Sequence, residues 1–97
     1  MNLLAETLVS TTENQIASDL EGEVVVLNVK DGVYYGLDGV GARVWELLAE
    51  PRTLAGILAD LLERYEVDAE RCEQDVRALL LDLEQRGLVE FADAATR

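Results

Sequence analysis

The spacing of the hydrophobic positions changes near residue 38, and the change separates a predicted sheet from predicted helices. Residues 23–29, E-V-V-V-L-N-V, are rich in β-branched side chains and form the strongest predicted strand. The pair Asp31-Gly32 follows, and residues 33–37 form the returning strand, because Asp-Gly tolerates the positive φ values of a tight hairpin. Two strands joined in this way are antiparallel neighbours.

The segment before this hairpin is weakly patterned. Residues 1–13 mix apolar and turn-prone side chains, so we expect a loose N-terminus there. A weak strand is expected within residues 8–19, centred on 15–18, and Glu21-Gly22 is a turn signal before the strong strand. The predicted sheet is therefore a small antiparallel meander.

Three helices are predicted after residue 38, where apolar positions recur at spacings of three and four. Asp38 is positioned to cap the first helix and Pro51 to stop it. Thr53 and Asp68 are positioned to cap the next two, and Gly87 to end the last one. Residues 89–91 add a short extended piece, and 92–97 are expected to fray. The apolar stripes are Val40, Val44, Leu47 and Leu48 in the first helix, Leu54, Ile57, Leu58, Leu61 and Leu62 in the second, and Cys72, Val76, Leu79, Leu80, Leu83 and Leu88 in the third.

These elements predict one α+β domain over residues 14–91, with a three-stranded antiparallel sheet followed by three helices. The order is similar to a winged helix-turn-helix in which the sheet comes first. In the returning strand, Val33, Tyr35 and Leu37 share one face, and we expect that face to be buried because Leu37 lies next to the first helix. No signal peptide or membrane span is expected, and the single cysteine fits a reducing compartment, so a cytoplasmic protein is predicted.

The charge argues against a nucleic-acid or membrane partner. The chain has 8 basic and 20 acidic residues, a net charge of −12, and would repel phosphate backbones and anionic membranes. The last predicted helix carries three arginines against six acids, the reverse of what a recognition helix needs. The acidity serves solubility or, as a sharper alternative, attracts a basic or neutral peptide.

The residue types needed for common catalytic sites are missing. The chain has no histidine, so neither a Ser-His nor a Cys-His pair can form, and Cys72 lies on an apolar helix face as a core residue would. One cysteine without histidine makes a zinc site improbable, and no phosphate-binding glycine motif is present. We therefore expect no enzyme activity, no cofactor and no metal.

The returning strand is the candidate site for a binding partner. A small meander leaves at least one strand edge open, and an extended peptide can add to such an edge. Tyr34 and Tyr35 could shape pockets for that peptide, or could only pack the sheet.

Four runs in order resemble the PqqD-like family: G-V-Y-Y-G-L-D, V-W-E-L-L, R-T-L-A-G-I-L-A-D-L and D-V-R-A-L-L-L-D-L-E-Q-R-G-L-V. The resemblance covers about residues 22–89 and is greatest to the stand-alone peptide-recognition elements of lasso-peptide biosynthesis. It implies a non-catalytic domain that binds the leader of a ribosomally synthesised precursor peptide. The leader adds antiparallel to the third strand, beside the last helix, and is presented to a leader peptidase and a cyclase. Leaders of this type often carry a Tyr-x-x-Pro motif, which needs an aromatic-sized apolar pocket.

The resemblance and the strand pattern together give a predicted peptide site in two parts. The strand contributes backbone groups and side chains, and residues 69–85 contribute the facing helix. Two aspartates lie two turns apart, where they could pair with a leader Lys or Arg or could only be solvated, and the apolar helix residues could instead be core. The predicted site residues are Val33, Tyr34, Tyr35, Gly36, Leu37, Asp75, Val76, Leu79, Asp82 and Leu83.

Two alternatives remain open. A PqqD-type chaperone would deliver a precursor peptide to a radical SAM enzyme rather than to a lasso peptidase. An acidic winged-helix regulator would retain weak DNA binding, which the net charge of −12 opposes.

Overall fold

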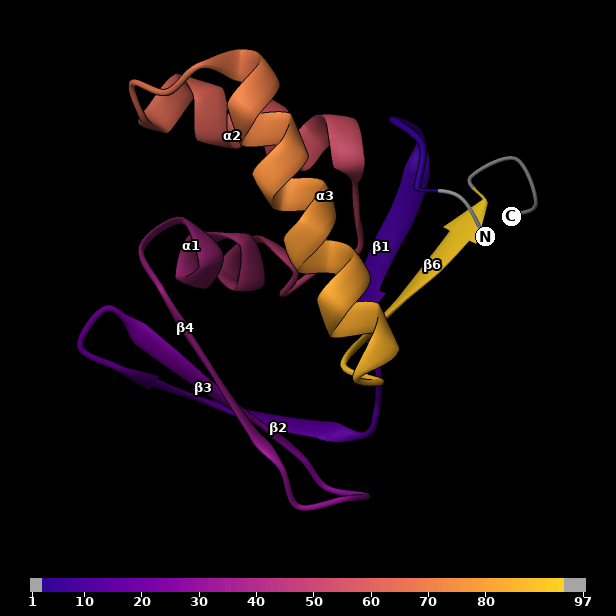
Figure 1. Cartoon of the computed structure of the whole chain (residues 1–97). Coiled ribbons are helices and arrows are strands. Elements are labelled where there is room, and N and C mark those ends of the chain that lie inside the picture. Colours follow the sequence, from indigo (N-terminus) through magenta and orange to yellow (C-terminus); the bar gives the residue numbers. More distant parts are fainter. Residues whose placement is uncertain (1–2, 94–97) are drawn as a thin grey trace.

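The computed structural model describes residues 3–93 and arranges them in the order β1-β2-β3-β4-α1-β5-α2-α3-β6. The described strands form two separate three-stranded sheets, with strand orders β2-β3-β4 and β5-β1-β6. Figure 1 shows the first sheet at lower left, β1 with β6 at right, and the helices above the first sheet. The predicted α+β class, with a three-stranded antiparallel sheet and three helices, is confirmed, and a second sheet accompanies it.

The sheet β2-β3-β4 is the predicted meander, formed by β2 (Gln15–Leu20), β3 (Glu23–Asn28) and β4 (Tyr34–Asp38). Glu21 and Gly22 have φ values of +51° and +85°, as the two central residues of a type I′ turn require. The β3–β4 loop is longer than the predicted tight turn, and β4 starts at Tyr34 rather than Val33. The physical reason is that side-chain oxygens within the loop accept hydrogen bonds from the loop's own N–H groups.

One face of this sheet packs on the helices. Val24 and Val26 of β3 are buried beside Leu37 and the partly buried Tyr35, which pair with them across the strands. The predicted burial of the Tyr35 and Leu37 face is therefore confirmed. Val33, assigned to the same face, lies outside the strand and is half exposed, so that part of the prediction is wrong.

The N-terminal segment is not loose as predicted, because residues 7–11 form a strand. This strand, β1 (Thr7–Thr11), pairs antiparallel with β5 (Arg52–Thr53) on one side and β6 (Val89–Asp93) on the other. Val9 at its centre is fully buried. The predicted extended piece at 89–91 is confirmed as β6, which also takes in residues 92 and 93 of the segment expected to fray. Residues 1–2 and 94–97 lie outside the described part of the chain.

The three helices are α1 (Gly39–Leu47), α2 (Leu54–Arg64) and α3 (Ala69–Gln85). Two of the predicted caps are confirmed: the Thr53 hydroxyl accepts from the Gly56 N–H at 3.0 Å, and the Asp68 carboxylate from the Arg71 N–H at 2.9 Å. Asp38 stands at the N-cap position of α1, but its side chain makes no capping hydrogen bond. The residue is still part of β4, and its backbone is extended.

The C-terminus of α3 is fastened by backbone and side-chain hydrogen bonds. Gly87 has a φ of +75°, as predicted, and its N–H and that of Leu88 donate back to Glu84 and Leu83, each at 3.0 Å. This pattern is a Schellman motif. The Asn28 side-chain amide, from the end of β3, donates to the Arg86 carbonyl at 2.7 Å, while its oxygen accepts from the Lys30 N–H at 2.9 Å. Asn28 therefore joins the β3–β4 loop to the end of α3.

We expect Asn28→Asp to lower the free energy of unfolding by about 2 kcal/mol, because a buried donor is replaced by a carboxylate facing a carbonyl at the negative end of a helix. The matched control is Asn14→Asp, since no side-chain hydrogen bond of Asn14 is found within residues 3–93. Urea unfolding at neutral pH measures both variants. Equal losses in the two would show that the Asn28 bridge contributes nothing.

The core lies between α2 and α3 and extends to the faces of both sheets that are covered by the helices. Its largest fully buried side chains include Leu54, Ile57 and Leu61 of α2 and Leu80 and Leu83 of α3. Their spacing of three and four residues is the one that predicted these helices. Within residues 3–93, no helix is both long and apolar enough to cross a membrane.

Candidate functional site

The free edge of β4 presents backbone hydrogen-bonding groups that no strand of the described chain uses. β4 is the outermost strand of its sheet, so only β3 pairs with it. The Asn28 N–H donates to the Val33 carbonyl at 3.0 Å. Since every second residue of an antiparallel strand directs its backbone N–H and C=O groups at its partner, Tyr35 and Leu37 exchange hydrogen bonds with β3. The backbone groups of Tyr34 and Gly36 and the N–H of Asp38 therefore point toward the open edge, while the Asp38 carbonyl belongs to the first turn of α1.

A cluster of three polar side chains joins β4 to the last turns of α3. The Tyr35 hydroxyl donates to the Asp82 carboxylate at 2.6 Å. Arg86 pairs with the same carboxylate at 3.2 Å, and its guanidinium lies 4.7 Å from the centre of the Tyr35 ring. Within residues 3–93, the backbone of β4 does not pack closely against that of α3. The two elements are therefore joined by their side chains.

This cluster shifts the protonation equilibria of two of its members. The pKa of the Asp82 carboxyl lies below its ordinary value, chiefly because it accepts the Tyr35 hydrogen bond and further because Arg86 is close. The pKa of the Tyr35 hydroxyl is raised, first by that hydrogen bond and then by partial burial. Asp82 is therefore ionised and already paired within the chain.

We expect Tyr35→Phe to lower the free energy of unfolding by about 1 kcal/mol near neutral pH, since one hydrogen bond to a carboxylate is lost. The depressed pKa of Asp82 stabilises the fold above about pH 4, and this contribution is lost as pH falls through the folded pKa. The raised pKa of Tyr35 stabilises it below about pH 10, and this contribution is lost as pH rises through the folded pKa. The difference between the proteins should therefore shrink at both ends of an unfolding series run against pH. Tyr34→Phe is the exposed control, and a difference independent of pH would contradict the assignment.

Closer to the centre of the site, the surface between β4 and α3 is apolar. Leu79 of α3 is partly buried, and its side chain approaches α1 at Gly41. A Cβ atom at Gly41 would lie 3.3 Å from the Leu37 side chain and 3.8 Å from that of Leu79. Glycine at this position therefore lets Leu37 and Leu79 approach α1 from β4 and α3.

Two hollows lie along α3, one beside its first half and one beside its end. A mostly apolar hollow of about 140 Å³ lies beside the start of α1 and the first half of α3. Another, of about 220 Å³, lies beside the start of β4 and the end of α3 and is more polar. The first is lined by Val40, Leu61, Tyr65, Val67, Arg71, Cys72, Asp75 and Val76. The second is lined by Asn28, Asp31, Val33, Tyr35, Gln85, Arg86 and Leu88.

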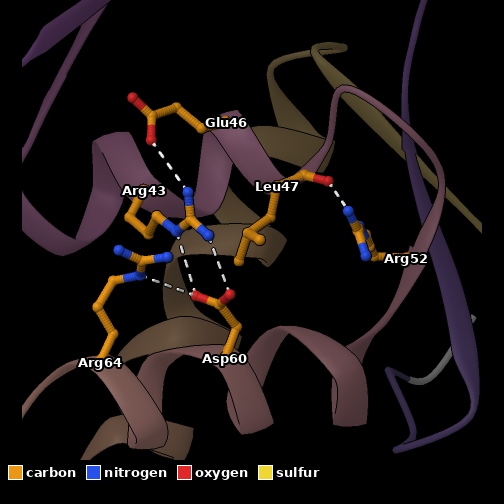
Figure 2. Close-up of polar contacts among 6 residues, drawn as sticks. All are labelled: Arg43, Glu46, Leu47, Arg52, Asp60 and Arg64. Atoms are coloured by element: carbon orange, nitrogen blue, oxygen red, sulfur yellow. Dashed lines mark hydrogen bonds and ion pairs between the residues drawn. The ribbon is translucent and has the colours of Figure 1, made fainter.

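An ion pair joins α1 and α2, two of the helices that flank the apolar hollow. Figure 2 shows Arg43 of α1 reaching Asp60 of α2 with two nitrogens, at 3.1 and 2.9 Å, while Arg64 approaches the same carboxylate. The hydrogen bonds from Arg43 lower the pKa of the Asp60 carboxyl, so the pair stays charged. The ion pair therefore links the two helices that contribute Val40 and Leu61 to the lining of the hollow.

The structure distributes the predicted site residues over five places. Tyr35, Leu37, Leu79 and Asp82 face one another between β4 and α3, and Asp75 and Val76 line the apolar hollow. Tyr34 and Gly36 offer backbone groups at the open edge, but their side-chain positions are on the opposite face of the sheet. Leu83 is fully buried in the core, and Val33 lines the polar hollow.

Sequence reasoning missed Arg86 and most of the lining of the apolar hollow. The visible signal for Arg86 was its position four residues after Asp82, the spacing of a helical ion pair. Cys72 was assigned to the core and is buried, but it also lines the hollow, and burial raises the pKa of its thiol. Within residues 3–93, no group of three or more His, Cys, Asp or Glu side chains could hold a metal ion.

The fold has counterparts among known proteins. The structure of TbiB1 in complex with the TbiA(beta) leader peptide has 33% sequence identity and a TM-score of 0.79, over 84% of this chain and 94% of that chain. A lasso peptide synthetase B1 complexed with the leader peptide has 22% identity and a TM-score of 0.75, over 84% and 96%, and shares the fold. No curated protein matches this chain. The family model for coenzyme PQQ synthesis protein D, PqqD, matches residues 23–89, more than half of the sequence, and the chain therefore belongs to the PqqD family.

Proposed function

We propose that this protein binds the leader segment of a ribosomally synthesised precursor peptide by adding it as a strand to β4. The observation that carries the proposal is the open edge of β4, with the outward backbone groups of Tyr34 and Gly36 and the N–H of Asp38, beside the apolar surface formed with α3. Membership of the PqqD family and the 33% identity to a protein solved with a leader peptide support it.

The packing of β4 and α3 supports one direction for the bound leader. Tyr35, early in β4, contacts Asp82 and Arg86, late in α3, so strand and helix run in opposite directions. A leader antiparallel to β4 runs parallel to α3, and its N-terminal part lies toward the apolar hollow. We propose that this hollow, of about 140 Å³, receives an aromatic side chain such as the Tyr of a Tyr-x-x-Pro motif.

The two predicted aspartates have different roles in this proposal. Asp82 is held by Tyr35 and Arg86, which leaves it poorly placed to take up a cation from the leader. Asp75 lies at the rim of the apolar hollow and pairs only loosely with Arg71, at 3.4 Å between two well-exposed side chains. A leader Lys or Arg near the aromatic residue would therefore meet Asp75.

We further propose that the protein presents the bound precursor to a leader peptidase and a cyclase in the cytoplasm, as a winged-helix-like recognition domain without chemistry of its own. Its similarity to TbiB1 favours lasso-peptide maturation. The match to the PqqD model favours a second candidate, in which the same groove delivers a precursor to a radical SAM enzyme. The neighbouring genes separate the two: a transglutaminase-like peptidase indicates the first and a radical enzyme the second.

The test is a titration of the fluorescently labelled leader of the precursor peptide encoded beside this gene. Gly36→Pro removes one outward N–H and leaves the hydrogen bonds between β4 and β3 in place. It should weaken leader binding about tenfold, roughly the effect of losing one well-made hydrogen bond. Gly36→Ala keeps the N–H, finds open space around the added methyl group, and should bind as the unaltered protein does. No binding of the unaltered protein at tens of micromolar would contradict the proposed function, and equal effects of both variants would contradict strand addition.

A further inference from the structure

The face of the β2-β3-β4 sheet that points away from the helices carries a row of apolar side chains across all three strands. Ile16 of β2 pairs with Leu27 of β3, and Leu27 pairs with Tyr34 of β4, so the three side chains lie side by side on one face. The alternate β3 residues, Val24 and Val26, face the core, which places this row on the outside. In Figure 1 the helices lie above this sheet and no element lies below it.

This row is unusually exposed for apolar residues. Tyr34 is 69% exposed, Ile16 61% and Leu20, near the end of β2, 57%. Val25 and Leu27 lie between them on β3 and are only partly covered. We call Ile16, Leu20, Val25, Leu27 and Tyr34 the outer patch. Isolated exposed apolar residues are ordinary, but a continuous patch of this kind marks an interaction surface.

The charge around the outer patch indicates which kind of partner fits it. Between residues 15 and 38 the only cation is Lys30, whereas the acids are Asp19, Glu21, Glu23, Asp31 and Asp38. A second copy of this chain, with the same acidic surroundings and a net charge of −12, would be repelled. A partner with apolar side chains inside a basic rim would be attracted and correctly oriented.

We propose that the outer patch is the docking surface for a protein partner with a basic-rimmed apolar face, and that it acts together with the bound leader. The inference rests on the proposed function, because the leader strand is added beside Tyr34. An added strand alternates its side chains, so every second leader residue joins the outer face and extends the row formed by Ile16, Leu27 and Tyr34. The partner would then contact the sheet and the leader at once, and leader binding would strengthen docking by about 5- to 150-fold.

The experiment uses the full chain, the labelled leader and the leader peptidase encoded in the same gene cluster as the probe partner. Ile16→Asp places a charge in the outer patch, and Leu62→Asp places the same charge at an exposed leucine of α2 outside it. Ile16→Thr keeps a β-branched residue and covers the case in which the aspartate weakens the strand. Leader affinity and peptidase affinity are measured separately, the latter with and without leader and at two salt concentrations.

The expected result is that Ile16→Asp weakens peptidase binding at least about tenfold, the effect of about 1.4 kcal/mol, and leaves leader affinity unchanged. Ile16→Thr should weaken it less, Leu62→Asp should have no effect, and raised salt should weaken docking. Equal effects at positions 16 and 62, no peptidase binding with or without leader, or self-association through the outer patch in sedimentation would each overturn the inference. If the unaltered protein does not bind the leader at all, the proposed function is refuted. The same variants would then still test whether the leader-free protein docks to the peptidase through the outer patch.

Discussion

Leu79→Asp is expected to lower the affinity for the leader peptide about 100-fold, or about 2.7 kcal/mol. Leu79 lies between β4 and α3, close to Gly41 and Leu37, where a bound leader would cover it. The substitution removes an apolar contact and leaves a carboxylate that the leader would strip of water without supplying a partner. The measurement is the same titration with labelled leader, on protein whose folding has been verified by circular dichroism and thermal unfolding.

The matched control is Leu81→Asp. Leu81 is two residues further along α3 and 41% exposed, on the side away from β4, so the same charge there should leave leader affinity within about twofold. Because Leu79 is partly buried, Leu79→Ser provides a milder second variant. If Leu79 and Leu81 variants that remain folded bind leader equally well, the leader does not lie between β4 and α3.

A shortened chain that starts at residue 14 is expected to lose about 3–6 kcal/mol of folding stability. The deletion removes β1, the central strand of the second sheet, together with the buried side chains of Leu3 and Val9. Burying one such side chain contributes about 1.5–3 kcal/mol, and a domain of this size is stable by only about 5–15 kcal/mol. The deletion also leaves β5 and β6 without a neighbour and removes the hydrogen bond from the Thr12 hydroxyl to the Gly87 carbonyl.

Two point variants test the same idea without shortening the chain. Leu3 is buried and Leu4 is half exposed, so Leu3→Ala should lower the free energy of unfolding by about 2 kcal/mol or more and Leu4→Ala by much less. Urea unfolding followed by Trp45 fluorescence measures all three proteins. A shortened chain as stable as the full one would show that residues 14–91 suffice for the fold, as the sequence pattern predicts.

The sequence by itself determined the features that depend on neighbouring residues. The β3–β4 hairpin, the caps at Thr53 and Asp68, and the helix end at Gly87 each follow from a few adjacent side chains. The buried faces of α2 and α3 follow from the three-and-four spacing of their leucines. The absence of histidine and the acidic charge are also read from the sequence alone, and the expectations of no enzyme activity and no nucleic-acid partner rest on them.

Only the tertiary structure decided the features that join distant segments. β1 reads as a weak, partly polar segment, and it becomes a central strand because residues 52–53 and 89–93 pair with its two edges. The partner of Asp82 is Tyr35, 47 positions away, so the sequence could show only its helical neighbour Arg86. The open edge of β4 likewise follows from the strand order β2-β3-β4, and the apolar hollow from how α1, α2 and α3 lie beside one another. Local residue preferences select each element, whereas the pairing of distant strands and helices decides which of their surfaces are left for a partner.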